Sequence, residues 1–146
     1  MKILVVASEA MPFIRTGGLA DSVGALTRAL AATGADVRLV IPRYSGIDKA
    51  MTRDMKMAAT GIVNLALRQL YYGVKKVRHH GVTTYFIDNE WYFKRDQLYG
   101  YQDDAERFAY FCRAVLAMLP EIGFHPDIIH CHDWHTGLVG TFLKED

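Results

Sequence analysis

The sequence predicts an α/β domain with a mostly parallel sheet and helices on both faces. Residues 2–8, KILVVAS, form an almost continuous apolar run, which is typical of a strand buried on both faces of a parallel sheet. Residues 36–42, DVRLVIP, repeat this pattern. Between the two runs the apolar residues change to a helical spacing. Strand, helix and strand therefore form one βαβ unit.

The helix between these strands is predicted to begin at Leu19. Asp21 lies in its first turn, where the helix dipole favours a carboxylate, and Gly34 stands where a helix is expected to stop. The apolar face is formed by side chains three and four residues apart, namely Leu19, Val23, Leu26 and Leu30.

The middle of the chain is predicted to be mainly strands. Residues 61–70 alternate apolar and polar side chains, and residues 72–89 form a hairpin with its turn near His80 and Gly81. The basic run in this hairpin consists of Lys75, Lys76, Arg78, His79 and His80. Because valines interrupt the charges and lysines often protect sheet edges, we interpret the run as a solvated edge rather than a binding surface.

The last third of the chain predicts a long helix, a strand and a shorter helix. Asp103 and Glu106 have the spacing of a capping box at the start of the long helix, and Pro120 is expected to end it. Its apolar stripe contains Phe108, Phe111, Cys112, Val115 and Leu119. Residues 126–134 then predict a strand, and residues 136–146 a helix. With so few parallel strands, the chain looks like part of a larger domain.

Composition and charge exclude several classes of protein. The net charge of +1 provides no strong attraction to nucleic acid or to an anionic membrane. No apolar segment is long enough to span a bilayer or to act as a secretory signal. Cys112 and Cys131 are far apart and form no CxxC pair, so we expect buried free thiols and a cytoplasmic location.

Residues 15–22, RTGGLADS, follow the first strand at the end where open α/β sheets bind ligands. Gly17 and Gly18 would let a ligand approach the backbone, and the N–H groups of the first helical turn attract phosphate oxygens. Arg15 could add a charged contact. The spacing is neither GxGxxG nor that of a P-loop, so the pattern alone leaves a plain tight turn as the alternative.

Residues 130–137, HCHDWHTG, lie at the end of the last strand. Their histidines and Asp133 suggest zinc ligands, but no further cluster completes a coordination shell. Strand alternation places His130 and His132 on one face and Cys131 on the other. We therefore favour a polar cluster that binds a substrate without metal. His130, deepest in the strand, is expected to be structural.

The loop before the long helix, residues 89–102, is rich in aromatic residues, among them Trp91, Tyr99 and Tyr101. Aromatic side chains in such a loop can line a sugar or nucleotide site. Packing of the loop against the domain is the alternative, and the sequence does not decide between them.

Together the two motifs resemble those of bacterial glycogen synthases and plant starch synthases. That family begins with a strand followed by SE…PF.KTGGL.DV.GALP.AL and later carries HxHDWHT. Here the corresponding segments are SEAMPFIRTGGLADSVGALTRAL and HCHDWHTGL. Between them, YQDDAERFAYF also resembles the family's Y.DN..RF..F. The likeness extends over essentially the whole chain.

The resemblance implies a retaining glucosyltransferase that moves glucose from a nucleotide-glucose, usually ADP-glucose, to the non-reducing end of an α-1,4-glucan. The family has the GT-B fold of two Rossmann-like domains and requires no metal or other cofactor. Residues 1–146 would be a truncated N-terminal, acceptor-side domain, without the C-terminal nucleotide-binding domain. We therefore expect the chain alone to be inactive. An incomplete sheet that exposes apolar surface would also favour self-association.

Carried over by position, the first motif implies contacts to the donor. Gly17 and Gly18 would face the donor phosphates, Arg15 stands where the family has a lysine that contacts the donor, and Asp21 belongs to the same motif. A guanidinium keeps the charge of that lysine but presents a planar fork.

The second motif and the aromatic loop imply the sugar site. Tyr99 and Asp133 match positions that line it, and His132, Trp134 and His135 belong to the motif. We expect Asp133 and His132 to act in catalysis. Asp133 could orient an acceptor hydroxyl or support developing positive charge, and these two roles stay open.

Three other positions depart from the family pattern: Ser22 replaces an apolar residue, Thr27 a proline and Asp104 an asparagine. The main alternative function is a non-catalytic glycan-binding or nucleotide-binding homologue, or one subunit of a split enzyme. A metal-dependent hydrolase built on HCHDWH is a third hypothesis.

Overall fold

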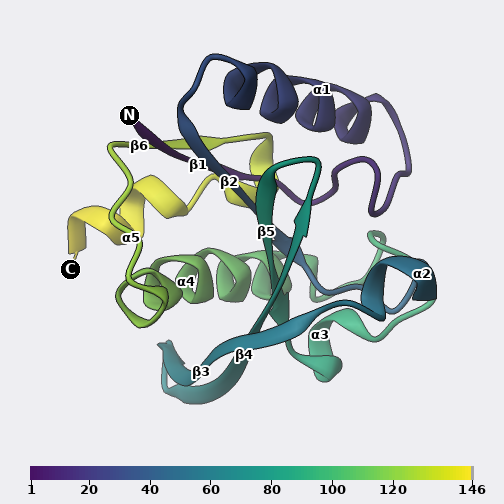
Figure 1. The fold of residues 1–146 in the computed structure, drawn as a ribbon. Coiled ribbons are helices and arrows are strands. Elements are labelled where there is room, and N and C mark those ends of the chain that lie inside the picture. Colours follow the sequence, from purple (N-terminus) through teal and green to yellow (C-terminus); the bar gives the residue numbers. More distant parts are fainter. Residues whose placement is uncertain (146) are drawn as a thin grey trace.

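A computed structural model describes residues 1–145 as an α/β fold around one six-stranded sheet (Figure 1). The strands are β1 (Lys2–Val6), β2 (Asp36–Pro42), β3 (Lys56–Leu65), β4 (Arg68–His79), β5 (Val82–Asp88) and β6 (Ile128–Cys131). The helices are α1 (Gly18–Ala32), α2 (Lys49–Thr52), α3 (Glu90–Phe93), α4 (Asp104–Ile122) and α5 (Val139–Glu145), with a 3-10 turn η1 (Trp134–Thr136). None of these helices is both long and apolar enough to cross a membrane.

The sheet has the order β3-β4-β5-β2-β1-β6. The four strands from β5 to β6 run parallel, whereas β3 and β4 form an antiparallel extension at the other edge. From β1 the chain proceeds to β2 and later β5 on one side, and then returns to β6 on the other side of β1. Strand order therefore reverses between β1 and β6, and ligands of open α/β sheets bind at such a reversal.

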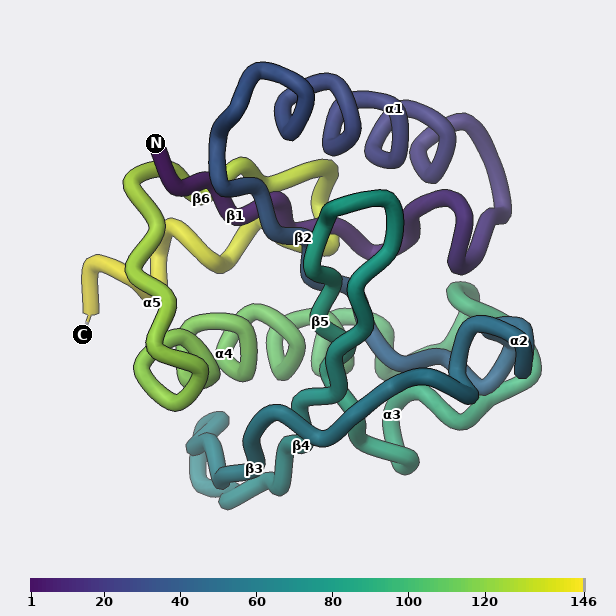
Figure 2. The backbone as a smooth tube through the Cα atoms, in the orientation of Figure 1, coloured from purple at the N-terminus to yellow at the C-terminus, as the bar shows by residue number. Residues whose placement is uncertain are grey.

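Helices cover both faces of the parallel strands, which confirms the predicted fold class. Figures 1 and 2 show α1 on one side of β1 and β2, and α4 on the other. The predicted apolar stripe of α4 is buried as expected. Pro120 does not itself end this helix, which continues for two more residues to Ile122, so the proline lies within the last turn. The helix ends at Gly123, whose φ of 66° is the left-handed conformation that glycine adopts easily.

The buried face of α1 differs from the predicted leucine stripe. Its fully buried residues are Ala20, Val23, Gly24 and Thr27, while the predicted leucines are only partly buried. The loop after β1 explains the difference, because Met11 N–H donates to the carbonyl of Ala20 at 3.0 Å. A Cβ at Gly24 would come within 2.7 Å of the Met11 carbonyl oxygen. Small residues therefore let the loop lie directly on the helix.

The predicted strand at residues 61–70 is wrong at its centre. The chain turns at Ala66 and Leu67, so that the segment contributes to both β3 and β4. The predicted turn at His80 and Gly81 is confirmed, and both residues have positive φ. Lys75 and Lys76 pair with β3 on one side and β5 on the other, so this part of the basic run does not lie on a sheet edge. Arg78 and His79 extend past Lys56, the first residue of β3, and pair with β5 alone, so the predicted edge is confirmed for these two residues.

The predicted capping box at the start of α4 is also wrong. Asp103 makes no side-chain cap, because its carboxylate binds the guanidinium of Arg95 at 2.6 and 2.8 Å. Glu106 instead accepts hydrogen bonds from Arg68 and from the Tyr92 hydroxyl. Both side chains are used by partners from other elements, which sequence spacing alone does not reveal.

Candidate functional site

The loops that carry the two predicted site segments follow the carboxyl ends of two neighbouring strands, β1 and β6. Val6, the last residue of β1, is in register with Cys131, the last residue of β6. His132 N–H continues this pairing by donating to the Val6 carbonyl at 3.0 Å. The glycine turn, residues 15–18, and residues 132–136 therefore lie at the strand-order reversal.

Glu9 organises the glycine turn from beneath. Its side chain is 2% exposed and accepts hydrogen bonds from the N–H and hydroxyl of Thr16, at 2.7 and 2.6 Å. Gly17 N–H also donates to it at 3.4 Å. These turn amides are therefore used within the protein. The N–H groups from Gly18 onward belong to the first turn of α1, where a helix leaves N–H groups without intrahelical partners.

Neither backbone conformation nor packing explains the glycine pair. Gly17 has an extended backbone with φ of −168°, and Gly18 is the first residue of α1. A Cβ added at either position would meet no other atom within 4 Å. The absence of both side chains instead leaves the start of the helix open to close approach by a ligand.

Arg15 and Asp21 bind one another at the mouth of this turn. The Nε of Arg15 lies 3.1 Å from both carboxylate oxygens of Asp21, and about half of each side chain is exposed, 53% and 51%. Exposed ion pairs contribute about 0–1 kcal/mol, so an incoming anion could compete for Arg15 at low cost.

A chain of hydrogen bonds joins the two motifs through Tyr99. The Tyr99 hydroxyl donates to Glu9 at 2.8 Å and lies 2.6 Å from the hydroxyl of Ser8, which lies 3.1 Å from Nδ1 of His135. As a carboxylate, Glu9 can only accept, so each proton along the chain points toward it. His135 therefore carries its proton on Nδ1 and keeps a lone pair on Nε2.

Ring packing holds His135 in this orientation. Tyr99 stacks on it with ring centroids 4.6 Å apart, Trp134 lies at 4.0 Å and Phe108 meets it edge-on at 4.8 Å. Burial lowers the pKa of His135 and raises the pKa of Tyr99 well above the usual range, so that burial favours the neutral form of both side chains. Trp134 is 56% exposed and covers the cluster on its outer side.

Asp133 and His132 form the outer part of the site. Asp133 has φ of 64° and ψ of −179°, a conformation that is nearly restricted to glycine and costs of order 1–3 kcal/mol. Its carboxylate accepts from Trp134 N–H at 2.7 Å and is otherwise exposed. Burial and the neighbouring His130 lower the pKa of His132. Within residues 1–145, its Nε2 atom is shielded from solvent and has no hydrogen-bond partner.

Two expectations about burial in the second motif are wrong. His130 is exposed, whereas His135 is the buried histidine at 5% exposure, because β6 is an edge strand and the chain turns inward only after it. Cys112 is buried but Cys131 is exposed. His130 and His132 do share one face, with ring centroids 4.4 Å apart. In the part of the chain that the structure describes, no three His, Cys, Asp or Glu side chains could hold a metal.

Of the aromatic loop, only Tyr99 joins the site. Tyr101 packs against the guanidinium groups of Arg95 and Arg107 at 4.9 and 5.0 Å, and Trp91 is 71% exposed. Asp104 shapes the loop by accepting from the backbone N–H groups of residues 100 and 101, at 2.8 and 3.2 Å.

Sequence reasoning missed Ser8 and Glu9, which connect the two motifs. Both are almost completely buried, and Tyr44 fixes Ser8 further by donating to its carbonyl at 2.7 Å. The available signal was their position, since two polar residues directly after a buried strand lie at the ligand-binding end of the sheet.

Comparison with known proteins places this geometry in a family. Residues 2–146 match the family model described as the starch synthase catalytic domain. The chain is 53% identical over 146 residues to a glycogen synthase of Anoxybacillus flavithermus, and 56% identical over 145 residues to one of Geobacillus stearothermophilus. The two matches include at least 99% of this chain, but the chain spans only 30% of the length of each of these curated relatives.

Solved structures show the same relationship. The catalytic domain of starch synthase IV from Arabidopsis thaliana, bound to ADP and acarbose, matches with a TM-score of 0.90 and 33% identity. That match covers 98% of this chain and 30% of the plant chain. A sucrose-phosphate synthase from Thermosynechococcus elongatus, at 17% identity and a TM-score of 0.56, shares the fold alone.

Proposed function

Because the chain belongs to the starch synthase catalytic-domain family, we propose that residues 1–146 form one wall of a glucosyltransferase active site. The reaction transfers glucose from ADP-glucose to the non-reducing end of an α-1,4-glucan with retention of configuration. The other wall comes from a C-terminal nucleotide-binding domain of the GT-B fold. The relatives of this chain are about three times as long as the chain itself, which supports a division of the active site between an N-terminal and a C-terminal part.

The observation that carries this proposal is the open glycine pair at the strand-order reversal. Gly17 and Gly18 leave space at the start of α1, although neither their conformation nor their neighbours require glycine. A diphosphate is the ligand chemistry that suits free N–H groups at a helix start. The plant starch synthase that shares this fold was solved with ADP bound, which supports the same ligand class here.

The reaction breaks the bond between the glucose C1 atom and the diphosphate oxygen, and the oxygen of a glucan hydroxyl forms the new bond to C1 while its proton passes to the departing diphosphate. The helix start and Arg15 stabilise the charge that develops on the departing diphosphate. Asp133, His132 and Tyr99 belong to the sugar side. The carboxylate of Asp133 either orients the acceptor hydroxyl or supports the oxocarbenium-like transition state.

The hydrogen-bond chain from His135 to Glu9 gives this half of the site its rigidity. It fixes the phosphate-side turn and the sugar-side segment relative to one another through two buried residues, Ser8 and Glu9. Such preorganisation reduces the reorganisation that the transition state would otherwise require.

A chimera tests the proposal. The matching N-terminal 145 residues of the Geobacillus stearothermophilus glycogen synthase are replaced by this chain, and transfer of radiolabelled glucose from ADP-glucose to glycogen is measured. We expect the chimera to be active and the 146-residue chain alone to show no transfer. In the chimera, Asp133→Asn should lower kcat by about 100-fold or more, as expected for loss of transition-state stabilisation.

Two results would contradict the proposal. One is a folded, thermally stable chimera without transfer activity, with the parent synthase as the positive control. The other is turnover by the isolated chain that is comparable to the parent synthase. Self-association and a cytoplasmic location stay predictions, and sedimentation equilibrium of the isolated chain measures the first.

A further inference from the structure

An open groove lies on the face of the sheet that packs against α4, near the amino ends of β2 and β5. Its volume is about 520 Å³, which is within the range of small-molecule sites. The groove is lined by four cationic side chains, Arg38, Lys56, Lys76 and Arg78, and by one carboxylate, Asp54. Because the whole chain has a net charge of only +1, this concentration of cations is local.

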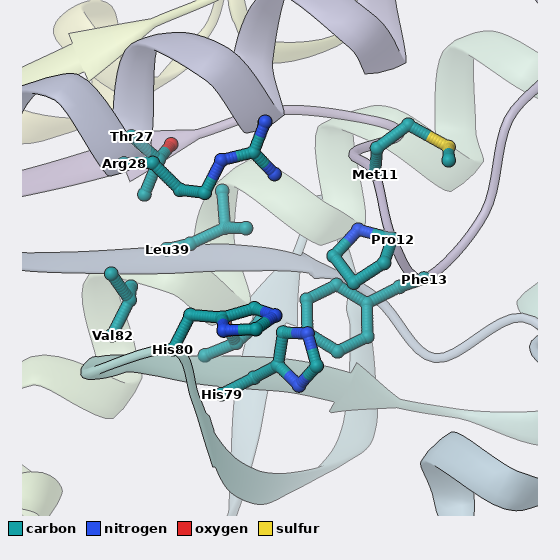
Figure 3. A pocket seen from close by; sticks show the side chains of 11 residues that line it. Met11, Pro12, Phe13, Thr27, Arg28, Leu39, His79, His80 and Val82 are labelled. Carbon is teal, nitrogen blue, oxygen red and sulfur yellow. The ribbon is translucent and has the colours of Figure 1, made fainter.

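The alternation of side chains along the strands separates this groove from the face that α1 covers. Figure 3 shows the α1 face, with Leu39 and His79 on it. Neighbouring residues of a strand point to opposite faces, so Arg38 and Arg78 point away from α1. The guanidinium of Arg38 agrees with this placement, since it lies 4.0 Å from the centre of the Phe124 ring, directly after α4.

Strand pairing brings two of the cations side by side. Lys76 of β4 is in register with Lys56 of β3 on one side and with Tyr85 of β5 on the other. Partners of this kind lie about 5 Å apart at Cβ, and two like charges there destabilise the sheet. Within residues 1–145, neither lysine forms an ion pair. Since Lys76 has a strand on either side, protection of a sheet edge does not explain its charge.

A second row of cations lies two residues further along β4. Thr83 of β5 is in register with Arg78 on one side and with Arg38 of β2 on the other. Arg38 binds the carboxylate of Asp36 through Nε and Nη2, both at 3.3 Å, whereas Arg78 forms no ion pair in the described part of the chain. The two rows are about 7 Å apart along the strands, and Arg78 and Arg38 are about 10 Å apart across them. A single phosphate group is too small to contact both rows.

Tyr85 adds a hydrogen-bond donor to the floor of the groove. Its side chain is 3% exposed, and its hydroxyl oxygen accepts from Nη1 of Arg38 at 2.7 Å. Because the oxygen accepts this bond, the hydroxyl proton can be donated to an oxygen atom of a ligand.

We propose that this groove binds a small molecule that carries two separate phosphate groups. One phosphate contacts Lys56 and Lys76, and the other contacts Arg78, with the Tyr85 hydroxyl as a further donor. Bonds from ammonium and guanidinium groups to phosphate oxygens are among the strong hydrogen bonds of proteins. The groove is at the opposite end of the parallel strands from the glycine turn, so it is separate from the proposed donor site.

Isothermal titration calorimetry of the full chain tests this proposal, with glucose 1,6-bisphosphate as the probe. We expect one site with a dissociation constant below about 1 mM. Binding should be tighter at about 50 mM than at about 300 mM NaCl, because salt screens exposed charges. Glucose 6-phosphate carries one phosphate and should bind at least about tenfold more weakly.

Three substitutions locate the site. Lys76→Gln and Arg78→Gln should each weaken binding about three- to tenfold, the loss expected for one charge-assisted contact. Arg28→Gln removes an equal charge from α1, on the other face of the sheet, and should leave binding unchanged (Figure 3). Lys76→Gln should also raise the unfolding temperature of the free chain, because it removes the repulsion with Lys56. Weaker binding by a more stable variant cannot be ascribed to loss of the fold.

Four results would each overturn the proposal. The first is the absence of saturable binding up to about 10 mM glucose 1,6-bisphosphate. The second is equal weakening by Arg28→Gln and Lys76→Gln, because binding would then reflect overall charge. The third is loss of binding in Arg15→Gln but not in Lys76→Gln, which would place the probe at the proposed donor site. The fourth is a lower unfolding temperature for Lys76→Gln, which would show that Lys76 already has a favourable partner.

Discussion

Gly18 and Gly24 have different surroundings, and an alanine substitution at each one tests the difference. Gly18→Ala adds a methyl group that meets no atom within 4 Å, and alanine favours helix over glycine. We expect the free energy of unfolding to rise by about 0.5–1 kcal/mol. In the chimera, the same change should raise the KM for ADP-glucose, because the methyl group occupies the space proposed for the phosphates.

Gly24→Ala is the matched opposite case. Its Cβ would lie 2.7 Å from the Met11 carbonyl oxygen, so the backbone has to move. We expect a loss of about 1–3 kcal/mol in urea denaturation, as for other overpacked sites. If both glycine variants changed stability equally, the distinction between an open and a packed glycine would be wrong.

The carboxylate of Glu9 accepts four hydrogen bonds, from Thr16, Gly17 and Tyr99. Glu9→Gln replaces one acceptor oxygen by an NH2 group, which faces donors from Thr16 and Gly17 or from Tyr99. We expect a loss of about 1–3 kcal/mol, the cost of buried donors without acceptors. Glu121→Gln, an exposed change of the same kind on α4, serves as control and should alter stability by less than about 0.5 kcal/mol.

At the scale of elements, the start of α4 determines where Tyr99 lies. Asp104 binds both the loop backbone and Arg107, a guanidinium that is 0% exposed and lies 2.8 Å from the Asp104 carboxylate. Asp104→Ala should cost about 3–5 kcal/mol, because it leaves a buried charge without its carboxylate. Asp104→Asn keeps an oxygen acceptor and should therefore cost less. Asp103→Ala breaks a more exposed ion pair, with Arg95, and should cost about 1 kcal/mol. Thermal denaturation of the three variants gives the order, and any other order contradicts this account.

The elements that could be predicted are those with a strong local signal. The apolar runs at β1 and β2 were sufficient to predict these two strands. Gly81 was sufficient to predict the turn between β4 and β5. The β3–β4 turn was missed because Ala66 takes a φ of 54° and Leu67 is fully exposed, and neither residue type marks a turn. The cap of α4 was missed because tertiary partners took the side chains that sequence spacing had assigned to it.

At the scale of the whole molecule, the order of the strands in the sheet could not be predicted from the sequence. Each strand in the parallel part was predicted, but no local pattern states that β6 returns to the free side of β1. The motifs were correctly placed at strand ends. Their contact through Ser8 and Glu9 depends on that pairing, and so only the structure shows it.

Stability of the whole chain should depend on pH through its shielded histidines. Burial lowers the pKa values of His79, His132 and His135 in the folded state below the usual 6.5. As the pH falls below 6.5, the unfolded chain therefore binds protons before the folded chain does, and folding becomes weaker. Each unit of lowering costs about 1.4 kcal/mol once the pH is below the folded-state value.

Urea denaturation at pH 7.5, 6.5 and 5.5 measures this dependence. We expect the free energy of unfolding to be similar at the two higher values and clearly lower at pH 5.5. In His135→Gln the decrease should be smaller than in the original chain, since one of the three groups is gone. A free energy that stays constant down to pH 5.5 would contradict the role of these histidines.

The hydrogen-bond chain also has a consequence for folding kinetics. Its contacts join residues 90, 91 and 127 positions apart, so they close only after distant parts of the chain have met. We therefore expect the site to assemble late in folding. The chain has two tryptophans, and in a Trp91→Phe variant the fluorescence of Trp134 would follow this last step alone.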